Sequence, residues 1–175
     1  MIAYKFLGAG AIAPFSRAGW PAPSANAPGA WVAVEGDLET CANGVHACSR
    51  EALAYWFDEE LWTVELADEI LDAGTVLVAR RGRLLERVTG WPTVSRAFAE
   101  DCAAHARRRV AAAGEEDRLA EVVADGEHHA ARADARGDAV VAAYAAAVAA
   151  AALEPGGFEA ERARQSGVLA ALLGL

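Results

Sequence analysis

The distribution of tryptophan and alanine divides this chain into two unlike halves. All five tryptophans lie within residues 1–91, whereas 28 of the 83 residues from 93 to 175 are alanine. Alanine has the highest helix propensity and lets helix axes approach closely, so the second half favours packed helices. The segment Gly90-Trp91-Pro92 marks the junction. We therefore expect a β-rich domain at 1–92 and a helical bundle at 93–175, packed together as one compact unit.

The first half shows the short alternating runs and turn signals of an antiparallel sheet. Four segments favour strands, namely residues 2–7, 30–35, 45–48 and 61–66. Residues 75–80 and 83–88 are predicted to form a hairpin around Arg81-Gly82. Between these strands, the apolar spacing of residues 50–57 predicts one short helix, with Ser49 as its cap. The loop at 19–29, with three prolines and two glycines, excludes regular structure.

After Pro92 the apolar period changes from two residues to about 3.6. Val94, Phe98, Cys102 and Ala106 recur at helical spacing and form one stripe. Breaks at glycine and proline then predict four helices, at residues 93–113, 115–136, 138–153 and 158–173. Their short connections favour antiparallel neighbours. The fold class is therefore predicted to be α+β, with a mainly antiparallel sheet followed by an alanine-rich antiparallel helical bundle.

The charge balance and the apolar runs exclude two classes of partner. The chain of 175 residues has a net charge of −9, and both halves are acidic, which excludes a nucleic-acid footprint. The most apolar stretch, Ala139 to Leu153, is shorter than the roughly 18 residues that a membrane span needs. No signal-peptide pattern opens the sequence, and three cysteines suit a reducing compartment. We therefore expect a soluble, cytoplasmic protein.

Five residues could supply ligands to a zinc ion. These are Cys41, His46, Cys48, Cys102 and His105. His46 and Cys48 alternate on a strand, and Cys102 and His105 share a helix face, so two pairs could meet in a tetrahedral site. Their spacing matches no standard zinc finger or ribbon, and cysteine is often a small buried hydrophobe. The favoured interpretation is therefore that no metal is bound.

Catalytic chemistry would have to centre on His46. An imidazole two residues from Cys48 can lower the pKa of a thiol, and Cys41 lies five residues upstream. No glycine-rich oxyanion element surrounds either cysteine. The sequence also lacks the Gly-x-Gly-x-x-Gly and P-loop motifs, so we expect no nucleotide cofactor.

A binding surface is indicated by aromatic and basic residues in the first half. Trp20 and Trp91 both precede prolines in predicted loops, where we expect them to be exposed as anchors for a ligand. Arg80 and Arg83 belong to a basic cluster that can bind an anion. Alternatively, each tryptophan pins its loop onto the sheet, and the arginines form a solvated strand edge.

The first half resembles an uncharacterised bacterial and phage domain with no established activity. The resemblance covers about residues 1–90 and is carried by Tyr4-Lys5, Gly44-Val45-His46-Ala47-Cys48, Tyr55 and Trp62-Thr63-Val64-Glu65-Leu66. The first half is also loosely similar to ADP-ribosyltransferases. That similarity implies an NAD site with His46 and Tyr55, and with Glu65 or Glu69 as the acidic residue.

The second half resembles the all-helical proteins assigned as immunity proteins of bacterial polymorphic toxin systems. The resemblance is carried by the segment from Phe98 to His105 and by Glu161-Arg162-Ala163-Arg164-Gln165, before Leu169 and Leu172. It implies a protein-binding role without catalysis.

Two functional hypotheses follow. The first is a binding module for a protein partner or a small ligand, and the alternative is a small enzyme centred on His46. A pocket lined by His46, Tyr55 and a buried carboxylate would favour the enzyme, whereas His46 with both ring nitrogens bonded to backbone would exclude it. The alanine-rich helix faces can pack within one chain or across a homodimer, and the sequence leaves this open.

Overall fold

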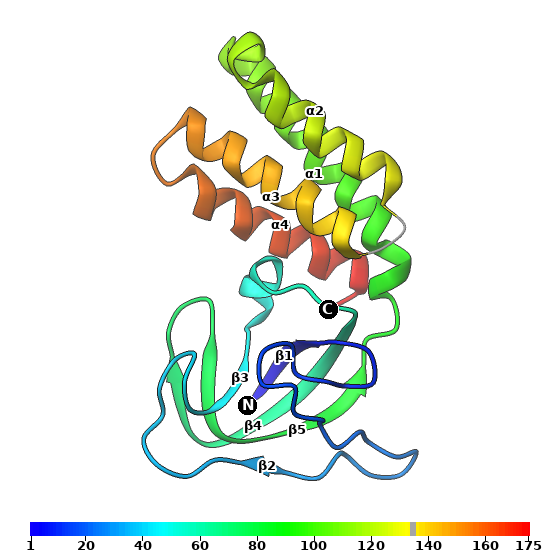
Figure 1. Ribbon diagram of the computed structural model, residues 1–175, viewed down its shortest axis with the longest axis vertical. Helices are drawn as coiled ribbons and strands as arrows, with labels where there is room; N and C mark the ends of the chain where they lie inside the picture. Colours follow the sequence, from blue (N-terminus) through cyan, green and yellow to red (C-terminus); the bar gives the residue numbers. More distant parts are fainter. Residues whose placement is uncertain (134–135) are drawn as a thin grey trace. The chain divides into compact units, whose positions relative to one another are not determined.

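The computed structural model describes residues 1–133 and 136–175 and divides the chain into two compact units. The units are Met1–Trp91 and Pro92–Leu175, so the division falls inside Gly90-Trp91-Pro92. An antiparallel sheet forms the first unit and four helices form the second, which confirms the predicted α+β class (Figure 1).

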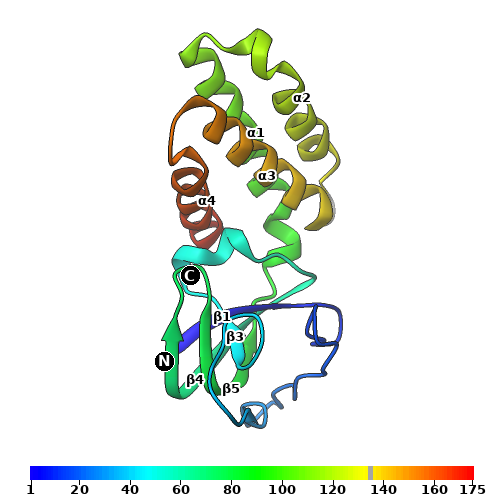
Figure 2. The same cartoon turned by 60° about the vertical axis from the view of Figure 1, so that its left-hand side comes forward.

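The sheet of the first unit is built on one long hairpin. Strands β4 (Glu60–Asp72) and β5 (Leu77–Arg87) pair with each other, and β1 (Ile2–Leu7) pairs with the free side of β4. Two short strands, β2 (Val32–Ala33) and β3 (Val45–Ala47), pair with different parts of β5. All of these pairings are antiparallel (Figure 2).

The predicted hairpin around Arg81-Gly82 is wrong, because β5 runs unbroken through both residues. The turn lies instead between β4 and β5, where Gly74 has φ +80°. Gly82 belongs inside the strand for a packing reason. A Cβ at this position would lie 2.6 Å from Val45 Cγ1 and 3.2 Å from Leu66 Cδ2. The glycine therefore lets neighbouring side chains close over the sheet, a role that a sequence pattern does not distinguish from a turn.

Two other local predictions change in detail. The helix expected at residues 50–57 is a short 3-10 helix, η1 (Arg50–Tyr55), and Ser49 makes no side-chain capping bond. The strand expected at 30–35 contracts to Val32–Ala33. The six residues of η1 would make too few α-helical hydrogen bonds to offset the free-energy cost of nucleating an α-helix, so the 3-10 form is favoured there.

One buried carboxylate fixes the first loop onto the sheet. Glu60 accepts hydrogen bonds from the backbone N–H groups of Gly10 (3.2 Å) and Ala11 (3.1 Å), and from Trp62 Nε1 at 3.0 Å. Ala11 has φ +59°, a conformation that a non-glycine residue rarely adopts. Burial alone would raise the pKa of Glu60, but these donors hold it below its ordinary value.

The helices of the second unit are α1 (Trp91–Ala113), α2 (Glu116–Arg132), α3 (Arg136–Leu153) and α4 (Gly157–Leu173). Each helix contacts two others, as in a four-helix bundle. Four polar contacts show this arrangement: Arg96 to Ala131 O, Arg118 to Ala152 O, Gln165 to Ala143 O, and Arg164 to Asp101. α3 therefore lies between α2 and α4.

The second helix is shorter than predicted. It ends at Arg132, and Arg136, its predicted end, begins α3 instead; the intervening residues 134–135 are outside the described part of the chain. Gly126 has a packing role within α2, because a Cβ there would lie 3.3 Å from the Cβ of Ala145. Among the described residues, none of the helices combines the length and the apolar character required to cross a membrane.

The packing at Gly82 gives a stability test. Gly82→Ala should lower the free energy of unfolding of the first unit by about 1–3 kcal/mol, because the new methyl group overpacks the contact with Val45. Urea unfolding followed by tryptophan fluorescence measures the change. Gly19→Ala is the matched control, since its Cβ would meet only Ile12 Cδ1 at 3.7 Å. Equal stability of the two variants would contradict this role of Gly82.

Candidate functional site

His46, the centre of the enzyme hypothesis, is held by backbone on both sides of its ring. The backbone N–H of Cys41 donates to His46 Nε2 at 2.9 Å, and His46 Nδ1 lies 2.9 Å from the carbonyl oxygen of Gly44. This pattern requires the neutral tautomer with hydrogen on Nδ1. Burial lowers the pKa of His46. Neither nitrogen is left for acid–base catalysis, so the ring acts as a brace for the loop before β3.

Lys5 on β1, the only lysine of the sequence, contacts the backbone of His46. Lys5 lies on the same face of the strand as the fully buried Ala3 and Leu7. Its Nζ donates to the carbonyl oxygen of His46 at 2.5 Å and lies 4.9 Å from the centre of the Trp20 ring. Burial lowers the pKa of Lys5 to about 8.

Cys48 directly follows β3, and it is a poor nucleophile. Only 1% of its surface is exposed, and burial raises the pKa of its thiol to about 12. The thiolate, which is the reactive form, is therefore scarce at neutral pH. Cys48 instead pairs with Tyr4 through two backbone hydrogen bonds of 2.9 and 2.7 Å, which tie β1 to the segment after β3.

Glu65, another predicted catalytic residue, lies far from His46 along the sheet. His46 is opposite Val78 on β5, whereas Glu65 is opposite Arg83, five residues further along that strand. This separation is about 17 Å at the usual strand rise. Glu65 forms an ion pair with Arg83 at 2.6 Å, Glu69 pairs with Arg80, and Tyr55 ends η1. The register therefore separates Glu65, one of the two acidic candidates, from His46.

The two tryptophans predicted to be exposed anchors are packed against the sheet unit. Trp91 is only 1% exposed, so the expectation that it is exposed is wrong. Its ring lies against Phe6 and Phe57, and its Nε1 donates to Asp58 O at 2.9 Å. Trp20 is partly buried against the core beneath Lys5. Both fit the alternative in which tryptophans pin loops onto the sheet.

The predicted anion-binding arginines already have carboxylate partners. Arg80 lies 2.7 Å from Glu69, and Arg83 lies 2.6 Å from Glu65. Arg81 and Arg83 also lie 4.8 and 4.5 Å from the centre of the Trp31 ring. These ion pairs cancel the positive charge that an anionic ligand would need.

The five candidate zinc ligands are divided between the units. Cys41, His46 and Cys48 belong to the first unit, and Cys102 and His105 belong to the second. In the described part of the chain, no group of three His, Cys, Asp or Glu side chains is placed to hold a metal ion. Cys102 is fully buried, and burial raises the pKa of its thiol to about 12.

A buried charge network joins α1 to α4. Glu161, with a side chain that is 1% exposed, accepts two hydrogen bonds of 3.1 Å from Arg164 Nε and lies 3.2 Å from His105 Nε2. Arg164 also donates to Asp101 at 2.6 Å, and Gln165 donates to Glu161 at 3.1 Å. The buried carboxylate of Glu161 thus has the opposite charge of Arg164 beside it, which is the pattern of a structural network.

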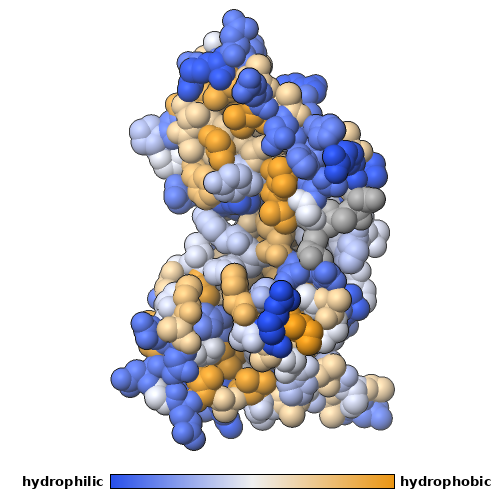
Figure 3. Space-filling model, viewed as in Figure 1, coloured by the Kyte–Doolittle hydropathy of each residue, from blue (hydrophilic) through white to orange (hydrophobic). Residues whose placement is uncertain are grey.

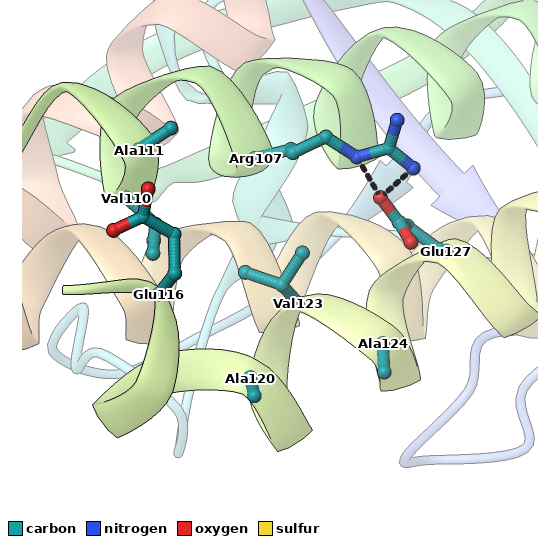
Figure 4. A pocket seen from close by; sticks show the side chains of 8 residues that line it. All are labelled: Arg107, Val110, Ala111, Glu116, Ala120, Val123, Ala124 and Glu127. Carbon is teal, nitrogen blue, oxygen red and sulfur yellow. Dashed lines mark hydrogen bonds and ion pairs between the residues drawn. The ribbon is translucent and has the colours of Figure 1, made fainter. Parts of the chain in front are cut away.

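Two surface hollows lie on the helical unit, and none of the site residues named in the sequence analysis above lines either of them. The first, between α1 and α2, has a volume of about 250 Å³ and is lined mainly by valine and alanine side chains. An ion pair between Arg107 and Glu127 crosses one end of it (Figure 4). The charges of Arg107 and Glu127 therefore neutralise each other at that end of the hollow.

The second hollow lies between α2 and α3, and we call it the α3 groove. Its volume is about 280 Å³, and its lining residues are Glu121, Val122, Asp125, Val141, Tyr144, Ala145 and Val148. Tyr144 is 54% exposed, and its ring lies 6.0 Å from that of Phe158 on α4. In the face that Figure 3 shows, hydrophobic residues gather over α3 and hydrophilic residues border them.

The sequence held a signal for this groove that the search for catalytic residues missed. From Ala139 to Leu153, α3 contains no charged residue. A helix that is apolar all round is normally covered on every side. α2 and α4 cover two sides, which leaves Val141, Tyr144 and Val148 in one line on the outer side.

Comparisons of the chain with protein-family models, with curated proteins and with solved structures find no match.

The bonds at His46 predict a pH dependence of stability. Protonation places hydrogen on Nε2, the atom that accepts the Cys41 N–H, so the protonated ring loses that bond. Because the folded pKa lies below the ordinary 6.5, the free energy of unfolding should decrease as the pH falls below 6.5 and level off beneath the folded pKa. Urea unfolding between pH 5 and 8, with His46→Gln for comparison, measures this; an unchanged slope in the variant would contradict it.

The charge network predicts a second stability effect. Glu161→Gln should lower the free energy of unfolding of the helical unit by about 3 kcal/mol, because Arg164 and His105 lose their shared carboxylate. Thermal unfolding followed by far-UV circular dichroism measures the loss. Glu159→Gln, the same change at an exposed position of α4, is the matched control and should leave stability within about 0.5 kcal/mol.

Proposed function

We propose that this protein is a non-catalytic binding module that recognises a protein partner through the α3 groove. The observation that carries the proposal is the uncovered outer side of α3. There, Tyr144 is 54% exposed between the half-buried Val141 and Val148. A large rigid aromatic side chain between apolar neighbours is the arrangement that dominates the binding energy of many protein interfaces.

The exposed lining of the α3 groove favours a protein over a small molecule. Pockets for small molecules typically enclose roughly 300–1,000 Å³ and bury most of the ligand. The groove holds about 280 Å³, and one of its lining side chains projects into solvent. It therefore suits one or two side chains of a partner whose remaining contacts spread over the surface around it.

The geometry of the first unit supports a role without catalysis. His46 has both ring nitrogens bonded to backbone, and Cys48 is a buried thiol with a raised pKa. Neither has the free, activated atom that a general base or a nucleophile requires. The resemblance of the second half to immunity proteins also implies a protein partner, and it remains part of the proposal.

Site-specific crosslinking tests the proposed surface. A photo-crosslinking amino acid at Tyr144 should capture one defined protein in the cells that encode this chain, because the side chain would be buried in the complex. The same amino acid at Ala104, an exposed position on α1, is the control and should not capture that protein. Equal capture at both positions, or none at Tyr144, would contradict the proposal.

The captured protein then allows an affinity measurement. Tyr144→Ala should weaken binding at least tenfold, as expected when an aromatic anchor is truncated, while Tyr144→Phe should retain most of the affinity. Phe15→Ala is a matched control, because Phe15 is 87% exposed on the first unit. Calorimetric titration measures the affinities, and a loss of the same size in the control would argue against the groove.

A further inference from the structure

We infer that the α3 groove receives a helical segment of its partner that is apolar on one face and carries basic residues beside that face. This inference rests on the proposed function and adds the chemistry of the partner. Two features carry it, namely the charge of the groove's edge and the linear arrangement of its apolar residues.

The α2 edge of the groove is acidic and largely without a counter-charge. Asp117, Glu121 and Asp125 recur every four residues along α2, so they lie on one side of the helix, and all three are exposed. Within the described part of the chain, Asp117 and Glu121 have no ion pair. Asp125 faces only His129, whose Nε2 is 3.7 Å away.

Arg118, the basic residue of α2 nearest to Glu121 in sequence, is engaged elsewhere, and Arg162 of α4 lies 5.7 Å from the centre of the Tyr144 ring and 5.4 Å from that of Phe158. Arg118 lies one turn before Glu121, but it is already paired with Glu115 at 2.6 Å and bonded to Ala152 O. Like charges spaced four residues apart destabilise a helix, and a basic partner relieves that repulsion. The hollow between α1 and α2 differs in this respect, because Arg107 already pairs with Glu127 there (Figure 4).

The apolar residues of the groove follow the outer side of one helix. Val141, Tyr144 and Val148 are spaced at i, i+3 and i+7, and Val122 faces them from α2. A straight apolar line beside an acidic edge matches the face of an amphipathic helix, which presents its own anchors at the same spacing. A β-strand would space its side chains on one face about 6.6 Å apart, wider than the rises of about 4.5 and 6 Å along this line, and would match it less closely.

The same charges disfavour a second copy of this chain as the occupant. A symmetric dimer through the groove would bring the two acidic edges towards each other, on chains that each carry a net charge of −9. Apolar contact at Tyr144 would have to overcome that repulsion. A basic partner would instead be attracted electrostatically by the same acidic edge.

A pair of designed peptides tests the inference. The first is an amphipathic helix with leucine on one face and lysine and arginine beside it, and the second replaces each basic residue with glutamate. Fluorescence anisotropy measures their binding to the full chain at two salt concentrations. We expect the basic peptide to bind, the acidic peptide to bind at least tenfold more weakly, and salt to reduce the difference.

Two charge variants separate the groove from general attraction to an acidic protein. Glu121→Gln with Asp125→Asn should weaken binding of the basic peptide at least fivefold. The control, Glu51→Gln with Glu100→Gln, removes the same charge at two exposed residues that do not line the groove and should change the affinity less than twofold. Equal losses in both variants would overturn the inference, because they would indicate nonspecific attraction.

The remaining outcomes distinguish this inference from the proposed function. If the acidic peptide binds and Tyr144→Ala weakens it, the groove binds protein but the inferred partner charge is wrong. If Tyr144→Ala affects neither peptide, the inference is wrong, and crosslinking at Tyr144 decides the proposed function by itself. A dimer that sedimentation detects and Tyr144→Ala abolishes would identify a second copy as the occupant and overturn the inference.

Discussion

The absence of charge along α3 is the constraint on which the helical unit depends. Fifteen consecutive residues, Ala139 to Leu153, carry no ionisable group except the phenol of Tyr144. Small alanines allow close approach to α2 at Gly126, and they leave the carbonyl of Ala143 within reach of Gln165 on α4. The same composition also leaves the outer side of α3 apolar. One feature therefore explains both the tight packing and the exposed groove.

Specific polar contacts complement this nonspecific alanine packing. Alanine faces are smooth and alike, so they give little information about how the helices align. The network of Asp101, His105, Glu161 and Arg164 connects defined positions of α1 and α4. Buried ion pairs contribute less net stability than their number suggests, because removing charges from water is costly. We assign this network the role of fixing the alignment of the two helices.

In the first unit, polar side chains hold loops rather than perform chemistry. Glu60 accepts hydrogen bonds from the N–H groups of Gly10 and Ala11. His46 and Lys5 hold the loop before β3 through hydrogen bonds to backbone groups. Each of these groups is satisfied mainly by backbone atoms. This explains why residue types that are common in active sites occur here without a catalytic arrangement. A histidine and a lysine act as a structural brace when backbone groups occupy their hydrogen-bonding atoms.

The sequence by itself determined the fold class, because alternation of period two and helical spacing record which side of each element is buried. The first strand and the four helices follow from that pattern within a few residues. Gly82 did not, since a glycine signals a turn or a close contact equally well and only the position of Val45 distinguishes them. The bonding of His46 was equally hidden, because both of its partners are backbone groups placed by the local loop conformation.

Only the tertiary structure decided which side of α3 forms the candidate binding surface. The neighbouring proline led us to predict that Trp91 is exposed, but its ring packs against Phe6 and Phe57. Tyr144 belongs to the uncharged run of α3, and it is exposed because α2 and α4 cover only two sides of that helix. Sequence periodicity shows how apolar an element is. Which of its sides remains uncovered depends on the number and position of its neighbours, and only packing fixes that.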